Sequence, residues 1–234
     1  AWALIDVETG KVVSAKNPRR WPQMFDFRAA YTEPPRSDRP LPPVRITLPD
    51  GQVVVSGQED AETNLSRCLG RQVTLRSAAP PQPQLEEYWP DMEELDRRDV
   101  VTDEAMPAGT FFDLAHVHLL TTATLAALQG AYPAGRFEVR RFRPNLMIRL
   151  DDPQPGFVEN GWIDRVVAIG DEVRLRITGP CPRCVMTTLP QSDLPADPDI
   201  LRTAARQNKA HVGVYASVVQ GGLVRRGDGL RLAD

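Results

Sequence analysis

Two cysteines, Cys181 and Cys184, stand three positions apart in the C-terminal half of the chain. Arg183 lies between them, and a neighbouring cation lowers the free energy needed to form a thiolate, the form of cysteine that reacts and binds metals. An apolar, strand-like run at 173–177 precedes the pair, and two consecutive threonines at 187–188 follow it. These residue types at this spacing predict either a soft-metal site or thiol chemistry.

A Cys-x-x-Cys sequence supports three chemistries. A structural zinc ion needs two further ligands, and neither a second Cys-x-x-Cys nor a histidine pair of matching spacing is nearby. His116 and His118 have no third ligand at a suitable spacing, so we interpret them as structural. A thioredoxin-type dithiol opens a helix after a strand, whereas strands and prolines flank this pair. A single thiolate that binds a soft transition metal or carries sulfur agrees best with the sequence.

An arginine-rich segment is the second candidate for chemistry. Arg140, Arg141 and Arg143 precede Asn145, and we predict a strand here that directs Arg141 and Arg143 to one face and Phe142 to the other. Arginine binds phosphate in a bidentate manner, and a nearby asparagine supplies both a donor and an acceptor. The segment therefore indicates an anionic cofactor, with a solvated strand face as the alternative.

The composition limits the class of protein. The 234 residues, 41% of them hydrophobic and 25% charged, suffice for one large domain or two small ones. A formal net charge of -3 gives no general attraction to nucleic acid or anionic lipid, so we expect neither as a partner. The odd number of cysteines, three, indicates a reducing compartment. We expect a cytoplasmic protein without a signal peptide and without an apolar run of the roughly 18–20 residues that span a bilayer.

Short elements are predicted along the whole chain, because 22 prolines cluster at 34–43, 80–90 and 180–198, and proline is excluded from helix interiors and central strands. Apolar alternation predicts strands at 1–6 and 11–15 (paired as a hairpin), 44–48, 52–56, 73–75, 116–120, 137–143, 146–148, 162–169, 173–177, 212–219, 223–224 and 230–232. Helical spacing predicts helices at 60–69, 123–128 and 199–207, bounded by Gly70, a threonine cap at 121 or 122, and Pro198. Cys68 lies on the apolar face of the first helix, and we interpret it as a core residue.

These elements predict three segments. Residues 1–76 form a small β-rich domain with one helix. Residues 77–109 combine a proline run with an acidic patch and little periodicity, which is typical of a lid or a mobile connector. Residues 110–234 show short strands and glycine turns, the pattern of a barrel or sandwich. The expected fold class is therefore mixed, β-rich α+β.

Six motifs in order along the chain carry a resemblance to a known family. They are Trp2-Ala3-Leu4-Ile5-Asp6, the run from His118 to Leu125, Arg141-Phe142-Arg143-Pro144-Asn145, Cys181-Pro182-Arg183-Cys184 with Thr187-Thr188, Gly213-Val214-Tyr215 and Gly227-Asp228. Each is weak alone, but the ordered set is specific. The chain resembles the MOSC (molybdenum cofactor sulfurase C-terminal) domain family, and more closely the YcbX-like bacterial proteins and the mitochondrial amidoxime-reducing component.

The resemblance implies a MOSC β-barrel preceded by a small β-rich domain, and Mo-molybdopterin as the cofactor. It implies that Cys184 ligates molybdenum and is the catalytic residue. The implied cofactor-binding residues are Arg143 and Asn145, Thr121, Thr122 and Thr124 before the helix, and Thr187 after the cysteines, with Arg141 and Arg183 as further anion contacts. The family usually also has a strand with a Lys-Ser pair and an arginine just before the tryptophan strand, and we expect this segment to precede Ala1.

The activity implied by the resemblance is reduction of small N-hydroxylated compounds, such as amidoximes or hydroxylaminopurines. Electrons would come from a separate flavin or iron–sulfur protein, because the chain has no Rossmann glycine fingerprint and no four-cysteine cluster. The alternative is a sulfur or molybdenum cofactor carrier that binds without turnover. A metal-free binding module is the third interpretation.

Overall fold

The computed structural model describes residues 1–36, 38–151 and 155–233, which form two compact units. Unit 1 comprises residues 1–89, 99–114 and 191–193, and unit 2 comprises 90–98, 115–190 and 194–234. Within the described ranges, no helix is both long and apolar enough to cross a membrane. Each unit has its own hydrophobic core and is described by itself.

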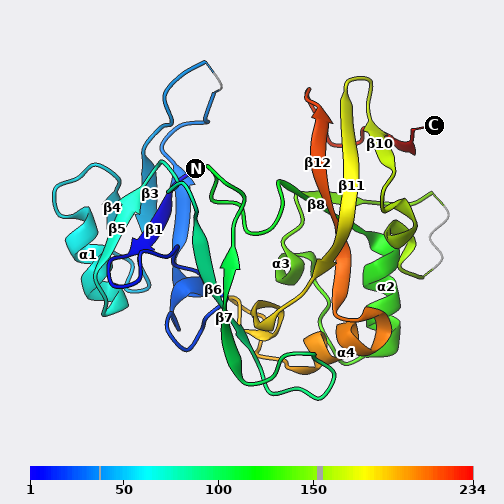
Figure 1. Cartoon of the computed structure of the whole chain (residues 1–234), viewed down its shortest axis with the longest axis horizontal. Coiled ribbons are helices and arrows are strands. Elements are labelled where there is room, and N and C mark those ends of the chain that lie inside the picture. The colour runs from blue at the N-terminus through cyan, green and yellow to red at the C-terminus, as the bar shows by residue number, and fades with distance from the viewer. Residues whose placement is uncertain (37, 152–154, 234) are drawn as a thin grey trace. The chain divides into compact units, whose positions relative to one another are not determined.

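Unit 1 is built from small antiparallel sheets and one turn-bounded helix (Figure 1). Its elements are β1 (Ala3–Asp6), the 3₁₀ helix η1 (Met24–Asp26), β2 (Arg28–Tyr31), β3 (Val44–Thr47), β4 (Val53–Val55), α1 (Ala61–Leu69), β5 (Val73–Arg76), β6 (Gln84–Trp89) and β7 (Val100–Ala105). The helix α1 ends at Gly70, whose φ of 67° is the left-handed conformation that glycine adopts without strain. Cys68 packs against the core of this unit, as predicted.

Two predictions for unit 1 are wrong. The segment 11–15 does not form a ladder with β1; the two meet at the bridge between Ile5 and Val12, and β1 pairs with β5 instead. The segment 77–109 is not without structure, because β6 and β7 pair as an antiparallel hairpin. Two glutamates of β6 pair with lysines far away in the sequence: Lys11 contacts Glu86, and Lys16 Nζ lies 3.0 Å from Glu87 Oε2 in a buried contact.

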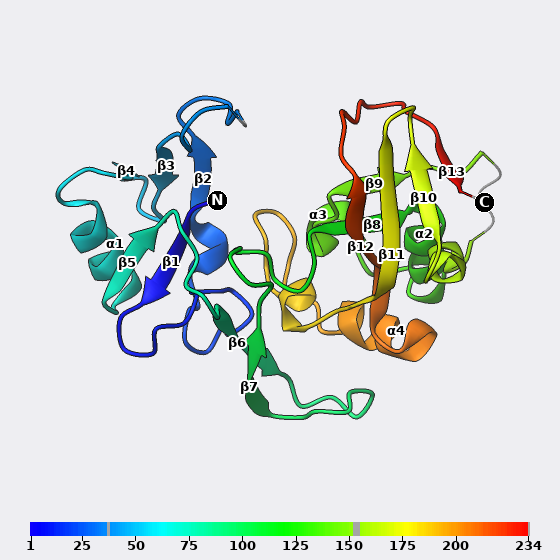
Figure 2. The same ribbon diagram turned by 45° about the horizontal axis from the view of Figure 1, so that its top comes forward.

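Unit 2 contains the larger sheet. Its elements are β8 (Val117–Thr121), α2 (Thr122–Ala131), α3 (Val139–Phe142), β9 (Leu146–Ile148), η2 (Val158–Trp162), β10 (Val166–Ile169), β11 (Val173–Pro182), η3 (Val185–Thr188), α4 (Asp199–Asn208), β12 (His211–Gln220) and β13 (Leu230–Leu232). Among the described residues, six strands pair in the order β13-β10-β11-β12-β8-β9, antiparallel except for β8 with β9. Figure 2 shows β11 as the long strand between β10 and β12. The β-rich α+β class is confirmed, with the sheet curled into a half barrel.

Apolar clusters cover both faces of the sheet at β8, where successive side chains point to opposite faces. On β8, Leu119 packs into one apolar cluster with β10, β11 and β12. Leu120 packs into a second cluster with α2 and α4, which contributes Leu128 and Ile200. These clusters fix β8, β11 and β12, the strands whose ends carry the candidate site.

The predicted strand at 137–143 is wrong, because residues 139–142 form the short helix α3. Strand alternation would send Arg141 and Phe142 to opposite faces, whereas both are buried within a helical turn. Phe142 stacks on Phe137 at a centroid distance of 6.4 Å inside the second cluster. The helix ends at Arg143, which has a left-handed φ of 52° and precedes a proline, a position where right-handed helix is disfavoured. Residues 223–224 do not form a strand, and the strand expected at 162–169 begins only at Val166.

Candidate functional site

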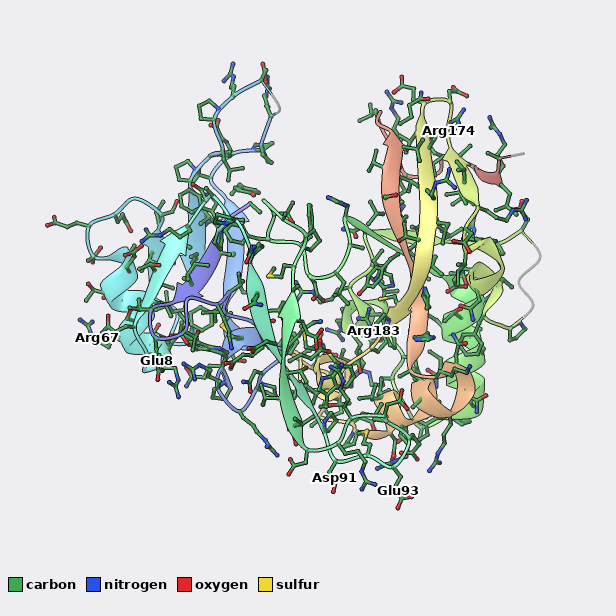
Figure 3. The ribbon with its side chains drawn as sticks, in the orientation of Figure 1. Glu8, Arg67, Asp91, Glu93, Arg174 and Arg183 are labelled. Carbon is green, nitrogen blue, oxygen red and sulfur yellow. The ribbon has the colours of Figure 1, made fainter. Side chains whose placement is uncertain are left out.

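The two cysteines lie where β11 leaves the sheet. Cys181 lies near the end of β11 and is completely buried. Cys184 occupies the N-cap position of η3, and its exposed fraction is 6%. Both are thiols. The ladder between β11 and β12 shifts register between Pro180 and Pro182, and its last pair joins Pro182 to His211, so the chain leaves β12 after the cysteine at position 181 and its following proline. Figure 3 labels Arg183 just past this end of β11 and Arg174 near the opposite end.

Arg183 connects the cysteine segment to α3. Its backbone N–H donates to the Ala210 carbonyl at 2.8 Å. Its Nη1 donates to Cys181 Sγ at 2.8 Å, and its Nη2 donates to the Phe142 carbonyl at 2.8 Å. The remaining donor, Nε, is buried and has no hydrogen-bond partner among the described residues. The structure thus brings the cysteine motif next to the segment that continues into Arg143.

The charge of Arg183 suits a thiolate neighbour. Burial alone would lower the pKa of this guanidinium, but Cys181, Cys184 and Tyr215 together outweigh burial and raise it. The guanidinium therefore remains a cation beside the two sulfurs, where it suits a metal-bound sulfur or an anionic ligand.

His118 supports this region from the neighbouring strand β8. It pairs with Tyr215 of β12, and the two rings meet edge to face at 6.0 Å. Its Nε2 lies 3.1 Å from the Val212 carbonyl. Burial, followed by the charge of Arg183, lowers the pKa of His118 to about 4, so the imidazole is neutral at neutral pH. These contacts agree with the structural role predicted for His118.

Gly213 allows His118 to sit here. Its φ of +83° is left-handed, and a Cβ at this position would lie 2.3 Å from His118 Nε2 and 2.4 Å from the Leu119 carbonyl oxygen. Val212 and Val214 on either side face different apolar clusters, as expected where an extra residue bulges out of a strand. The glycine in the Gly-Val-Tyr motif is therefore required by the backbone conformation and by the close approach of the imidazole.

Arg141 holds the segment that follows Cys184. It is almost completely buried, and its guanidinium donates to the backbone carbonyls of Arg136, Thr187, Leu189 and Pro195 at 2.8–3.3 Å. Burial lowers its pKa. Arg141 therefore positions the chain after η3, while its role as an anion contact stays a prediction.

Arg143 and Asn145 lie beside His118. The Asn145 backbone N–H donates to the His118 carbonyl at 2.9 Å, and Asn145 Oδ1 accepts from the His118 N–H at 2.8 Å. The side chain of Asn145 thereby extends the pairing of β8 with β9. Arg143 is exposed. Of the predicted arginines, Arg143 is the one whose side chain faces solvent beside the site.

The threonines at the start of α2 divide into two kinds. Thr121 caps the helix by accepting from the Thr124 N–H at 3.2 Å. The hydroxyls of Thr121 and Thr124 both donate to the carboxylate of Glu159, each at 2.7 Å. Glu159 is completely buried. By contrast, the buried Oγ1 of Thr122 has no hydrogen-bond partner among the described residues, and its role as a cofactor contact stays a prediction.

Thr187 closes the turn of η3, because its Oγ1 donates to the Cys184 carbonyl at 3.0 Å. Thr188 makes the equivalent contact with the Val185 carbonyl at 2.7 Å. The sequence had no signal for Glu159, which lies in a loop without a recognisable motif. A buried carboxylate is identified only once the fold surrounds it with hydroxyl donors.

The fold and the site together define a β-rich α+β protein with buried thiols and an arginine at the end of a long strand. The protein-family model of the MOSC domain matches residues 108–231, more than half of the chain. The chain belongs to the MOSC domain family, as predicted.

Comparison with individual proteins adds less. No curated protein matches the sequence. Among solved structures, the chain is similar to YiiM from Geobacillus stearothermophilus, with 19% sequence identity and a TM-score of 0.38. The similarity covers 50% of this chain and 54% of that chain, so this chain spans about half the length of its structural neighbour.

Proposed function

We propose that this MOSC protein binds the molybdenum cofactor through Cys184 and reduces N-hydroxylated compounds. The observation that carries the proposal is the buried thiol of Cys184 next to Arg183, whose Nε–H has no partner among the described residues. A soft sulfur donor beside a guanidinium is the combination that a metal with an attached anionic organic group requires.

The described residues fit such a cofactor. Two buried polar atoms, Arg183 Nε and Thr122 Oγ1, lack partners among the described residues, and a buried donor without a partner is costly unless a ligand satisfies it. Arg143 is exposed, so its guanidinium can reach an anionic ligand from the solvent side. Thiolate, hydroxyl and guanidinium together match a metal, a polar ring system and a phosphate.

Each residue has a defined task in this proposal. Cys184 would hold molybdenum, and Arg143 and Arg183 would bind the anionic part of the cofactor. The cofactor, when bound, supplies oxygen-atom transfer, the chemistry needed to remove the oxygen of an N-hydroxyl group. Arg141 keeps the chain after Cys184 in place by binding its carbonyls. His118 is buried and neutral at neutral pH, so it adds no positive charge to the site.

The proposal includes an electron donor and a location. Within this chain there is no Rossmann glycine fingerprint, and three cysteines are too few for a four-cysteine iron–sulfur cluster. We therefore include a separate flavin or iron–sulfur protein as electron donor in the proposal. The odd cysteine count favours a reducing compartment, which for this proposal is the cytoplasm.

Metal and pterin content test the proposal first. We expect purified protein to contain molybdenum and pterin, the Cys184→Ala variant to lose molybdenum, and the matched Cys68→Ala variant, altered at a thiol in unit 1, to retain both. Equal molybdenum in wild type and Cys184→Ala would contradict the assignment of the ligand. Benzamidoxime reduction with an artificial electron donor then distinguishes the functions: turnover supports the reductase, and bound cofactor without turnover indicates the carrier.

A further inference from the structure

Cys181 is not used by the function proposed above, although its side chain is completely buried beside the site. Its neighbours on β11 are held by the sheet, since Pro180 pairs with Val214 and Pro182 pairs with His211 of β12. The position of the sulfur is therefore fixed by strand pairing. It accepts a hydrogen bond from Arg183 Nη1 at 2.8 Å.

The guanidinium of Arg183 is planar, so two anchored nitrogens determine the direction of the third. Nη1 is anchored by Cys181 Sγ, and Nη2 is anchored by the Phe142 carbonyl. The Phe142 ring also lies beneath the guanidinium carbon, at 5.7 Å. Nε is then the one nitrogen of the fork left without a partner among the described residues.

From this geometry we infer that Cys181 is a positioning residue: its sulfur holds Arg183 so that the Nε–H is directed at the anionic group of a ligand bound at Cys184. The inference deepens the proposed function, on which the identity of the ligand rests. The orientation of the guanidinium does not depend on that function. A lysine at position 183 would not replace the arginine, because an ammonium group cannot bind in three fixed, coplanar directions.

The rival explanation is that Cys181 is only a small apolar residue that fills space in the core. Three substitutions separate the two explanations. Cys181→Val fills the space without an acceptor, Cys181→Ser keeps an acceptor with less volume, and Cys181→Ala is a smaller replacement without an acceptor in case valine does not fit. Cys68→Ala controls for the loss of a thiol elsewhere.

The orientation of Arg183 has a direct spectroscopic signature. In the ¹H–¹⁵N spectrum of the purified full chain, we expect a dispersed, slowly exchanging Nε–H resonance that disappears in Arg183→Lys. In Cys181→Val and Cys181→Ala it moves to the position of solvent-exposed arginines, and exchange accelerates about tenfold, the effect of losing one hydrogen bond. Cys181→Ser and Cys68→Ala keep the wild-type resonance. A packing role predicts the opposite order, with valine closer to wild type than serine.

Molybdenum content of the same samples separates failure of this inference from failure of the proposed function. The inference predicts less molybdenum per chain in Cys181→Val than in Cys181→Ser. An unchanged Nε–H resonance in both Cys181→Val and Cys181→Ala, or its loss in Cys181→Ser, overturns the inference. A lost resonance with undiminished molybdenum overturns the link to the ligand. Wild-type protein without molybdenum refutes the proposed function, and the resonance alone then decides whether Cys181 positions Arg183.

Discussion

Replacing Arg141 by methionine removes the contacts that hold the chain after Cys184. The side chain is 1% exposed, and its guanidinium donates to four backbone carbonyls, three of them in the segment from Thr187 to Pro195. Methionine keeps much of the aliphatic stem and has no donor. We expect unit 2 to lose stability and the segment after η3 to open.

The size of the loss follows from two opposing terms. Four carbonyls lose their donor, at about 1–3 kcal/mol for each buried group left unpaired. Removing the buried charge returns several kcal/mol, because a cation no longer has to be taken out of water. The balance is a loss of about 3 kcal/mol in the free energy of unfolding.

Urea unfolding, with hydrogen exchange followed on peptides from β8 and β12, measures this loss for unit 2 separately. The matched control is Arg140→Met on the same helix, where the side chain is 40% exposed and pairs with Glu138 at the surface. We expect Arg140→Met to remain close to wild type. An Arg141→Met loss below about 0.5 kcal/mol, the range of ordinary surface substitutions, would refute the role of Arg141, as would equal losses in the two variants.

Three further predictions concern the residues around the site. Gly213→Ala places a Cβ 2.3 Å from His118 Nε2, so we expect the free energy of unfolding to fall by about 2 kcal/mol or more and the Tm to fall with it. The control Gly221→Ala, whose Cβ meets no atom within 4 Å, leaves the Tm unchanged. Equal Tm values for the two variants would contradict this reading of the bulge. Glu159→Ala leaves the hydroxyls of Thr121 and Thr124 unpaired and lowers the free energy of unfolding in urea by about 2–4 kcal/mol. Glu159→Gln keeps one acceptor oxygen and lowers it less; the reverse order would contradict the hydrogen bonds from the two threonines. Because the folded-state pKa of His118 is about 4 and the unfolded value is about 6.5, the unfolded chain binds the additional proton as the pH falls between these values. Stability is therefore lost on acidification, by about 2 kcal/mol between pH 7 and pH 5, and His118→Phe removes this part of the slope; identical slopes in the two proteins would exclude it.

Local signals in the sequence identified many elements of the fold. The helix α1 is ended by Gly70, and α2 is capped by Thr121, because capping depends on residues within one helical turn. The long strands β11 and β12 follow from apolar alternation. Cys184 and Arg183 were predicted from spacing and family resemblance, and the structure places the Arg183 guanidinium against the Phe142 carbonyl.

The missed features depend on residues far apart in the sequence. The hairpin β6–β7 is supported by lysines such as Lys16, whose partner Glu87 is 71 residues away. The helix α3 is formed where Arg141 reaches carbonyls up to 54 residues further along the chain, which strand alternation does not anticipate. The role of the buried Glu159 could not be predicted, because its partners Thr121 and Thr124 lie 38 and 35 residues away in the sequence.

Coordination of molybdenum by the Cys184 sulfur is open to direct measurement by X-ray absorption at the molybdenum edge. We predict that the purified protein shows a sulfur shell around molybdenum that loses one scatterer in Cys184→Ser, while Cys68→Ala gives the wild-type spectrum. An identical sulfur shell in wild type and Cys184→Ser, or wild-type protein without molybdenum, would contradict the assignment of Cys184 as the metal ligand.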